Sequence, residues 1–312
     1  MSELKNDNVN EASVAAPVLS TMVERDMKKV STKQKVMKIL STVAVYTFLI
    51  VIAIAVLFPF YWMIISSLKS YNEYRLNPPT FFPTMGIRWG NYGAAFTEGS
   101  LGVLFINTVY VGVVSTIFSL VITVLTAFAF ARLEFKGKNT LFALLLSTMM
   151  IPGELFTITN FITVAEFGWI NTYTVLIVPF LVSVFYIYLL RQNFLQIPNE
   201  LYLAAKVDGT KDLKYLWKVM IPLALPTLIS ITILKMMGSW NSYMWPNLVA
   251  NDKNMRLVTN GLKQLSLVVE GNQPDYPKQM AAVALVSAPL FLVFLFLRKY
   301  IMKGVSRSGI KG

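Results

Sequence analysis

The chain has 312 residues, of which 55% are hydrophobic and only 14% are charged, and its formal net charge is +12. Soluble domains carry about 25% charged residues, so this composition predicts an integral membrane protein. The chain contains no cysteine and no histidine, which excludes disulfides, thiolate nucleophiles, histidine metal sites and Ser-His-Asp catalysis.

A polar stretch over residues 1–35 opens the chain and is expected to be a largely disordered cytoplasmic tail. After it, hydropathy in windows of about 19 residues predicts six membrane spans, near residues 40–66, 102–131, 139–162, 172–190, 222–246 and 280–301. The first span contains the uncharged run "VAVYTFLIVIAIAVLF" and exceeds the ~20 residues that cross a ~30 Å hydrocarbon core as a helix. The predicted fold is all-α, with a six-span domain over 36–301 and a short tail over 302–312.

Lys and Arg are distributed unevenly between the two sides of these spans. Of 28 such residues, 20 fall in the N-terminal tail, in 132–138, in 191–218 and from Arg298 onward, whereas the connections on the other side hold 7. Because cytoplasmic loops are enriched in Lys and Arg, both termini are expected in the cytoplasm of a multi-pass cell-membrane protein. The net charge is then a matter of topology, and no nucleic-acid partner is expected.

The third predicted span contains Pro152 and Gly153, followed by Glu154. Proline either ends a helix or kinks it. A helix end is expected here, with a gating hinge as the alternative.

A charged, amphipathic segment separates the fourth and fifth spans and reads "ELYLAAKVDGTKDLKYLWKVMIPLALP" over residues 200–226. A first short helix is predicted after Pro198, with Asn199 as its N-cap. One face of this helix carries small and acidic residues: Leu201, Ala204, Ala205 and Asp208. Gly209 is expected to end the helix, because glycine readily adopts the left-handed conformation that helix ends require.

A second short helix is predicted from Thr210, its candidate cap. Apolar residues at helical spacing predict a buried stripe: Leu213, Leu216, Trp217 and Met220. Lys211, Lys214 and Lys218 lie on another face. Periodicity alone leaves two interpretations open, an amphipathic pair lying on the inner membrane surface and a docking element for a cytoplasmic partner.

The order of residues in this segment resembles the coupling loop of permease subunits of ATP-binding-cassette (ABC) importers. The family pattern E-A-A-x-x-D-G-A corresponds to "LAAKVDGT" at 203–210, with "QIPNEL" before it and "MIPLALP" after it. Leu203 stands where the family has a glutamate implicated in contacting the ATPase, and Glu200 or Asp208 are the alternative sources of that charge. The resemblance implies that the loop 196–222 couples to an ATPase through these residues: Glu200, Leu203, Ala204, Ala205, Asp208 and Gly209.

The resemblance covers all but about the first 35 residues, and segments 105–142, 168–179 and 239–248 are also similar to the family. The terminal "GVSRSGIKG" resembles the tail of the carbohydrate-importer branch, of the maltose permease type. It implies a type I ABC importer permease fold and a contact of the cytoplasmic tail through Gly309, Lys311 and Gly312.

The function implied by the resemblance is that of a half-channel that imports an oligosaccharide or monosaccharide. The implied partners are a second permease subunit in a heterodimer, two copies of an ABC ATPase and an extracytoplasmic solute-binding protein. The chain lacks the phosphate-binding pattern G-x-x-x-x-G-K-[ST], since "FKGKNT" at 135–140 lacks the leading glycine and the Ser/Thr. ATP and Mg are therefore expected on the separate ATPase, and this chain is expected to be no enzyme, with no cofactor, metal site or catalytic residue.

Candidate residues for the substrate path combine aromatic rings, amides and a charge within two spans. They are Trp240, Asn241, Tyr243 and Lys235 in the fifth span and Asn107 in the second. The alternative for the aromatic residues is an interfacial belt, common in membrane proteins. For Lys235 the alternatives are snorkelling or pairing with the partner permease, since an ionisable residue inside a span costs about 2.5–3.5 kcal/mol on insertion scales.

Three further functions stay open as alternatives: a permease for glycerol phosphate or another polar solute, a self-sufficient secondary transporter, and a membrane-embedded enzyme. Proton-coupled transporters commonly carry acids or histidines within their spans, and an enzyme needs convergent catalytic groups. The predicted spans offer no histidine and no acid except Glu154 near a boundary. The importer subunit is therefore the favoured interpretation.

Overall fold

The computed structural model of the chain describes residues 32–265, 267–269 and 273–306. Nearly all of the expected N-terminal tail lies outside the described residues, as do Gly309, Lys311 and Gly312. The chain divides into two compact units, the first ending at Tyr61 and the second beginning at Trp62. The described part of the first unit is helix α2 (Thr32–Ser67) up to Tyr61, and this helix starts within the stretch expected as tail.

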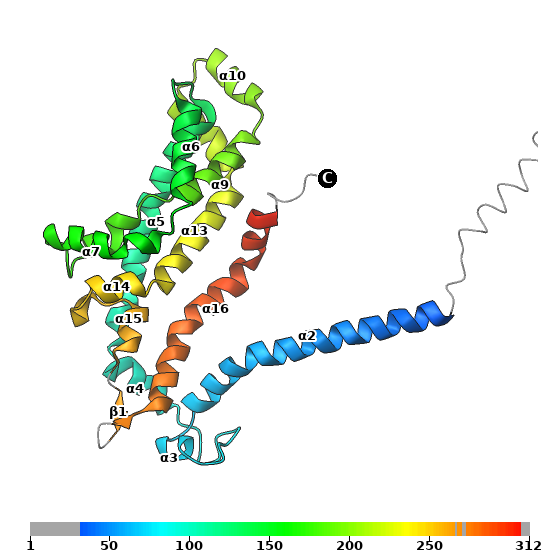
Figure 1. Ribbon diagram of the computed structural model, residues 1–312, viewed down its shortest axis with the longest axis vertical. Helices are drawn as coiled ribbons and strands as arrows, with labels where there is room; N and C mark the ends of the chain where they lie inside the picture. Colours follow the sequence, from blue (N-terminus) through cyan, green and yellow to red (C-terminus); the bar gives the residue numbers. More distant parts are fainter. Residues whose placement is uncertain (1–31, 266, 270–272, 307–312) are drawn as a thin grey trace, which may run out of the picture. The chain divides into compact units, whose positions relative to one another are not determined.

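The described part of the chain is mostly helical (Figure 1). Its longest helices are α2, α5 (Leu101–Arg132), α13 (Leu225–Asn241) and α16 (Tyr276–Ser306). The shorter elements are α3 (Tyr71–Tyr74), α4 (Gly90–Glu98), α6 (Lys138–Thr148), η1 (Gly153–Phe156), α7 (Thr157–Glu166), α8 (Tyr173–Ile177), η2 (Val178–Phe180), α9 (Val184–Leu195), α10 (Asn199–Val207), α11 (Asp212–Tyr215), η3 (Leu216–Met220), α12 (Ile221–Leu223), α14 (Met244–Val249), η4 (Lys253–Met255) and α15 (Val258–Lys263). Strands β1 (Val268–Val269) and β2 (Gln273–Pro274) form an antiparallel pair.

Three helical stretches are each long and apolar enough to cross a membrane: Val36–Ser67, Leu101–Arg132 and Tyr276–Phe296. Three more qualify only as bent pairs: Lys138–Thr148 with Gly153–Glu166 (79°), Tyr173–Phe180 with Val184–Leu195 (44°), and Asp212–Leu223 with Leu225–Asn241 (80°). With each pair taken as one span, the described residues contain the six spans that were predicted, in the predicted order. The helix end expected near Pro152 is present, because α6 stops at Thr148.

The predicted extent of the fifth span, 222–246, is wrong at its end. Helix α13 stops at Asn241, and α14 begins at Met244. Proline has no N–H, so Pro246 cannot donate to the carbonyl of Ser242, four residues earlier. That carbonyl accepts a hydrogen bond from the Thr259 hydroxyl instead, and the chain turns away from the helix axis.

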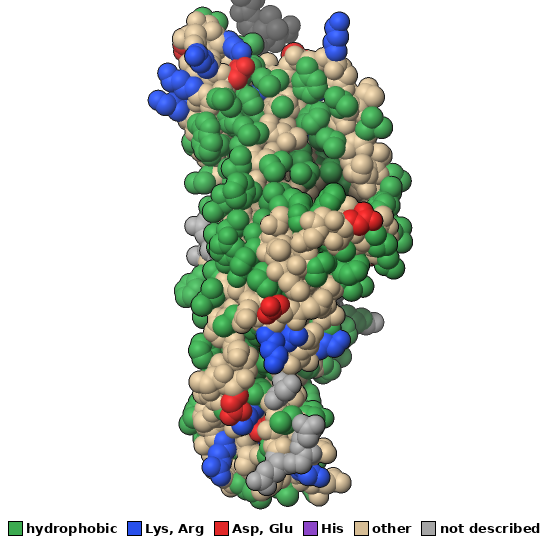
Figure 2. Space-filling model, turned by 90° about the vertical axis from the view of Figure 1, so that its left-hand side faces the viewer, with side chains coloured by type: hydrophobic (Ala, Val, Ile, Leu, Met, Phe, Trp, Pro, Cys, Tyr) green, Lys and Arg blue, Asp and Glu red, His purple; other side chains and the backbone are tan. Residues whose placement is uncertain are grey.

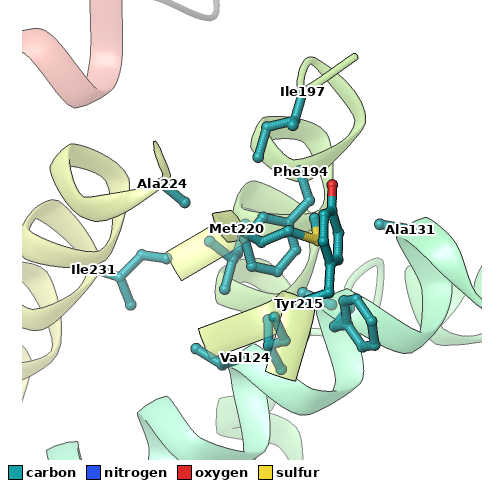
Figure 3. Close-up of a cluster of buried hydrophobic side chains, with 12 residues drawn as sticks. Val124, Ala131, Phe194, Ile197, Tyr215, Met220, Ala224 and Ile231 are labelled. Atoms are coloured by element: carbon teal, nitrogen blue, oxygen red, sulfur yellow. The ribbon is translucent and has the colours of Figure 1, made fainter. Parts of the chain in front are cut away.

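Helix α5 is the central element of the second unit. It packs against α9, α13, α8 and α15, and α16 packs against α13 and α4 (Figure 1). A buried apolar cluster joins α5, α9, η3 and α13 (Figure 3). Its members are Val124, Ala127, Phe128, Ala131, Leu190, Phe194, Ile197, Tyr215, Leu216, Met220, Ala224 and Ile231. Close packing of these side chains gains many dispersion contacts, which hold the four elements together.

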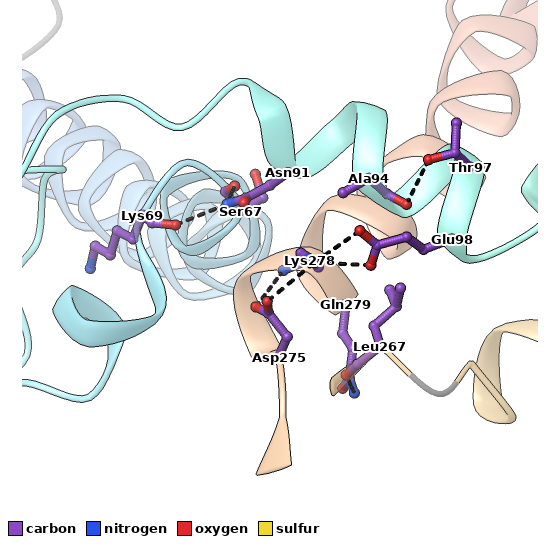
Figure 4. Close-up of polar contacts among 10 residues, drawn as sticks. All are labelled: Ser67, Lys69, Asn91, Ala94, Thr97, Glu98, Leu267, Asp275, Lys278 and Gln279. Carbon is purple, nitrogen blue, oxygen red and sulfur yellow. Dashed lines mark hydrogen bonds and ion pairs between the residues drawn. The ribbon is translucent and has the colours of Figure 1, made fainter. Parts of the chain in front are cut away.

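Polar contacts fix the elements at the end of the second unit opposite α10 (Figures 1 and 4). Asn91 of α4 donates to the carbonyls of Ser67 and Lys69, at 2.8 and 2.9 Å. Lys278 of α16 pairs with Glu98 of α4 at 2.9 Å. Because these contacts join segments far apart in the sequence, they hold α4 between the end of α2 and the start of α16.

The loop after α3 is organised by the buried carboxylate of Glu73. One oxygen accepts hydrogen bonds from the Thr84 amide at 2.5 Å and the Thr84 hydroxyl at 2.9 Å, and the other accepts from the Met85 amide at 3.3 Å. Burial alone would raise the pKa of Glu73, but these bonds and one from Thr80 hold the pKa below its ordinary value of 4.5. The buried Lys69 amine donates to the Thr80 carbonyl, so the loop is pinned from both sides.

We predict that acid loosens this loop. A carboxyl with a lowered folded-state pKa stabilises the fold above its unfolded pKa and loses that contribution as the pH falls through the folded value. Hydrogen exchange of the Thr84 and Met85 amides, corrected for intrinsic rates, should lose protection between neutral pH and about pH 3. In Glu73→Gln the protection should be low at every pH, and wild-type protection that does not change with pH would contradict the prediction.

Candidate functional site: an exposed short helix and a polar cavity

Helix α10 begins and ends through local signals close to those expected. It starts at Asn199, with Pro198 rather than Asn199 in the cap position and no side-chain cap bond. At its end Gly209 has φ +70°. The amide of Thr210 donates to the Ala205 carbonyl at 2.8 Å, and that of Gly209 to Lys206 at 3.0 Å. These two bonds form a Schellman motif, so Gly209 ends the helix as predicted.

The two sides of α10 differ in their surroundings. Tyr202 and Ala205 pack against the apolar cluster below them. The opposite side carries exposed residues: Glu200, Leu201, Leu203, Ala204, Val207 and Asp208. Leu203 is 55% exposed and Val207 is 88% exposed, and their spacing of four places them on one face. An exposed apolar face on a helix this short is typical of a surface that a partner covers.

A small polar cluster holds the inner side of α10 against the segment that follows. The Tyr202 hydroxyl donates to Asp212 at 2.9 Å, and the Lys206 amine lies 2.7 Å from the same carboxylate. The rings of Tyr202 and Tyr215 are 5.1 Å apart. Its hydrogen bonds to Asp212 and Tyr202 raise the pKa of Lys206 above its ordinary value. These contacts, all within ten residues of α10, hold its inner side against the segment that follows it.

The second predicted helix forms, but its buried stripe was predicted wrongly. Leu216 and Met220 are buried as expected, whereas Leu213 and Trp217 are 59% and 61% exposed and Tyr215 is buried instead. The cause is a π-helical stretch over Leu216–Met220. Its i→i+5 bonds widen the turn, which places Tyr215 and Met220 on the same side and turns Trp217 away.

The cap and the lysines of this second helix can also be compared with their predictions. The cap position is taken by Lys211, not by Thr210, and no side chain caps the helix. Lys211, Lys214 and Lys218 are exposed as predicted, but they share the exposed side of this helix with Leu213 and Trp217.

Two arginines attach this region to the rest of the bundle. Arg132, the last residue of α5, donates to the carbonyls of Phe194 and Ile197 at 2.9 and 2.6 Å. Arg191 of α9 donates to the Phe130 carbonyl at 3.0 Å, and its guanidinium lies 4.0 Å from the ring centre of Phe142. Neither role could be predicted from the sequence, in which both arginines count only toward the cytoplasmic charge.

A cavity of about 340 Å³ lies among α5, α9 and α13. Its polar lining residues are Ser115, Ser183, Tyr186, Lys235, Ser239 and Ser242, and its apolar ones are Val111, Leu176, Phe180, Val182, Trp245, Pro246 and Leu257, with Gly238. The Lys235 amine donates to the carbonyl of Phe180 at 2.6 Å. The size falls within the range of ligand pockets, about 300–1,000 Å³.

Of the predicted path residues, Lys235 alone lines this cavity. Trp240 faces α16 and donates to the Val286 carbonyl at 3.3 Å. Asn241 donates to Met237 of its own helix, and the ring of Tyr243 lies 5.2 Å from the Lys263 amine.

Asn107 is buried, and its amide group is occupied by contacts within the fold. It donates to the carbonyls of Asn254 and Arg256, at 2.7 and 3.0 Å, and accepts from the Tyr173 hydroxyl at 2.7 Å. The lining serines were missed by sequence reasoning. Small polar residues inside apolar spans, such as Ser115 and Ser239, were the available signal.

The part of the chain that the structure describes contains no cluster of potential metal ligands. No group of three or more His, Cys, Asp or Glu side chains comes together there. The arrangement offers contact surfaces and a polar cavity.

Comparison with known proteins gives a consistent result. The family described as binding-protein-dependent transport system inner membrane component matches residues 119–307. The arabinooligosaccharides transport system permease protein AraQ of Halalkalibacterium halodurans is 32% identical over 282 residues, covering 90% of this chain and all of that protein. The sn-glycerol-3-phosphate transport system permease protein UgpE of Pectobacterium atrosepticum is 27% identical, covering 84% and 95%. One chain of a bacterial ABC transporter involved in the import of the acidic polysaccharide alginate has the same fold, with a TM-score of 0.76 at 23% identity and coverage of 86% of this chain and 98% of that chain.

We predict that Arg132→Met loosens the segment that carries α10. The substitution leaves the carbonyl of Ile197 without its donor, at a cost of about 1–3 kcal/mol for a buried group. It also removes one of the two donors of the Phe194 carbonyl, which keeps its bond from the Ile197 amide at 3.3 Å. The purified protein should melt at a lower temperature, and amides of residues 194–208 should exchange faster. Arg88→Met, which removes an exposed arginine, should change stability by less than about 0.5 kcal/mol. Equal effects of the two substitutions would contradict the role assigned to Arg132.

Proposed function

This chain belongs to the family of binding-protein-dependent transport system inner membrane components, and from that premise we propose that it is the permease subunit of an ABC importer that moves a sugar into the cytoplasm. ATP is hydrolysed by a separate ATPase subunit, which also holds the nucleotide and Mg. The observation that carries the proposal is α10, a short helix with a firmly held inner side and an exposed apolar outer face.

The ATPase contact is assigned to the exposed face of α10 and the turn after it. Glu200, Leu203, Ala204 and Asp208 project from this helix, Ala205 supports its inner side, and Gly209 closes it. Leu203 and Val207 make the centre of the face apolar, so the contact there rests on burial of apolar surface rather than on an ion pair. Glu200 and Asp208 place charge at its two ends.

The cytoplasmic side is assigned to α10 and to both termini. The excess of Lys and Arg in 132–138, 191–218 and the two tails supports this orientation. Figure 2 shows basic side chains at the end of the second unit that carries α10, followed by a broad surface of hydrophobic side chains. The tail contact through Gly309, Lys311 and Gly312 stays a prediction, as those residues lie outside the described part.

The remaining partners complete a transport path that one chain cannot form alone. They are a second, related permease subunit, a second copy of the ATPase and an extracytoplasmic solute-binding protein that delivers the cargo. Family membership supports the ATPase and the binding protein, and the heterodimeric pairing is our expectation.

A sugar is the cargo best supported by the site and the relatives. AraQ is named for arabinooligosaccharides, and the serine hydroxyls, Tyr186 and Trp245 around the cavity suit a body with many hydroxyls and an apolar ring face. Glycerol phosphate, for which the UgpE relative is named, is the second candidate. A proton-driven secondary transporter is less well supported, because no acid is found among the described residues that line the cavity.

We predict that Gly209→Val detaches the ATPase. A left-handed conformation costs an L-residue about 1–2 kcal/mol, and a β-branched residue more, so the turn after α10 should open. Recovery of the ATPase with the tagged chain from native membranes should fall roughly tenfold, since 1.4 kcal/mol corresponds to a factor of ten.

Gly168→Val is the matched control for this experiment. Gly168 has φ +68°, follows α7 in the same kind of turn and also has open space around it, but it lies away from α10 (Figure 1). Retention of the ATPase by Gly209→Val, or equal loss in both variants, would count against the coupling role.

We predict that Gly238→Phe blocks transport without preventing assembly. Gly238 lines the cavity, and a Cβ there meets no atom within 4 Å, so a large ring can fill the space that the cargo needs. Overpacking of about 1–3 kcal/mol against a bound solute should lower ATP-dependent uptake of labelled galactobiose or digalacturonate roughly tenfold or more. Gly238→Ala should transport normally, and normal uptake by the Phe variant would exclude this cavity from the path.

A further inference from the structure

Among the described residues that line the cavity, Lys235 is the one charged side chain. Lys235 lies well inside α13, and no Asp or Glu is among the lining residues. Among the described residues no carboxylate lies within 4.0 Å of its amine. A cation in an apolar span is retained where function requires it. Because Lys235 has no carboxylate beside it, we infer that a negatively charged group from outside the described residues enters the cavity.

The amine of Lys235 has spare donors directed at the same space. An ammonium carries three N–H donors, and the carbonyl of Phe180 accepts one. Within the described part of the chain no second acceptor is recorded for this group. The bond to Phe180 fixes the amine at the break between η2 and α9, where Val182 and Ser183 also line the cavity. The remaining donors are therefore available to a ligand.

The first turn of α9 adds positive potential at the same place. Helix N-termini carry partial positive charge and unpaired amides. Ser183 caps α9, its hydroxyl accepting from the Tyr186 amide at 3.4 Å, and both residues line the cavity. Lys235 and the helix end thus converge from two elements, which favours an anionic group bound beside them.

The hydroxyl groups around the cavity define the rest of the ligand. Ser115 and Ser239 lie 3.4 Å apart across α5 and α13, and Ser242 and Tyr186 add further groups that both donate and accept. Ser115 also donates to the Gly112 carbonyl at 3.2 Å, and the hydroxyls keep further donor and acceptor capacity. A polyhydroxylated body can use that capacity, whereas the hydrocarbon part of a fatty acid or an aromatic acid cannot.

We propose that the cargo of this permease is an anionic polyol, a solute with a carboxylate or phosphate on a polyhydroxylated body, and that Lys235 binds the anionic group in transit. The inference rests on the proposed function and narrows its substrate class. The competing occupant for Lys235 is a carboxylate of the second permease, and the experiment distinguishes the two.

The test is uptake by cells that carry the complete transport system, with matched labelled probes. Digalacturonate and galactobiose differ only in their carboxylates, and sn-glycerol 3-phosphate and glycerol differ only in the phosphate. We expect one anionic probe to be imported in preference to its neutral partner, and that probe identifies the group as carboxylate or phosphate. Lys235→Met should lower its uptake about tenfold or more, the worth of a hydrogen bond to a charged group.

Two further variants separate this role from a structural one. Lys235→Arg keeps the charge and should retain most of the anionic uptake, and Lys253→Met, which removes an exposed lysine outside the cavity, should have no effect. In both Lys235 variants the second permease and the ATPase should copurify at wild-type levels.

Several results would overturn the inference. Two concern the wild type: preferential import of a neutral probe, and import of neither anionic probe. Two concern Lys235→Met: an equal fall in the uptake of both members of a pair, and loss of the second permease on purification. The last of these would assign Lys235 to subunit pairing. The proposed function itself fails by a different result, a chain that purifies without any ATPase. An importer of neutral sugars would therefore refute the inference and leave the proposed function standing.

Discussion

The bonds between Arg132 and the end of α9 determine where α10 and its exposed face lie. The last carbonyls of a helix have no donor within the helix and carry partial negative charge. Arg132, at the end of α5, supplies a buried cation to the carbonyls of Phe194 and Ile197. Since α10 begins two residues after Ile197, this contact fixes its starting point on the bundle.

Helix α9 connects the two parts of the candidate site. Its first residues border the cavity, beside Lys235, and its last turn is held by Arg132. A helix of 12 residues spans about 18 Å at 1.5 Å per residue and transmits displacement as a rigid element. The proposed ATPase contact and the proposed cargo contact are therefore joined by one continuous piece of secondary structure.

The breaks in the helices create the polar surfaces on which this function depends. Unpaired backbone groups are costly in hydrocarbon, so irregular backbone occurs where protein or a water-filled cavity surrounds it. Phe180 at one break accepts from Lys235, and Ser242 at another accepts from Thr259. Asn107 satisfies two carbonyls of the loop beyond α14, which explains why it is buried and does not line the cavity.

The sequence by itself determined the membrane spans, the exposed lysines of the coupling segment and the helix end at Gly209, because hydropathy and backbone preferences act locally. It also indicated the family, through the order of residues around Asp208. The tertiary structure alone decided that Tyr215 is buried rather than Trp217. It also decided that Asn107 and Trp240 each form hydrogen bonds to backbone carbonyls of other segments, and that Lys235 lines the same cavity as four serines. Those outcomes depend on which distant segments become neighbours, and helical periodicity specifies a face without specifying what will cover it.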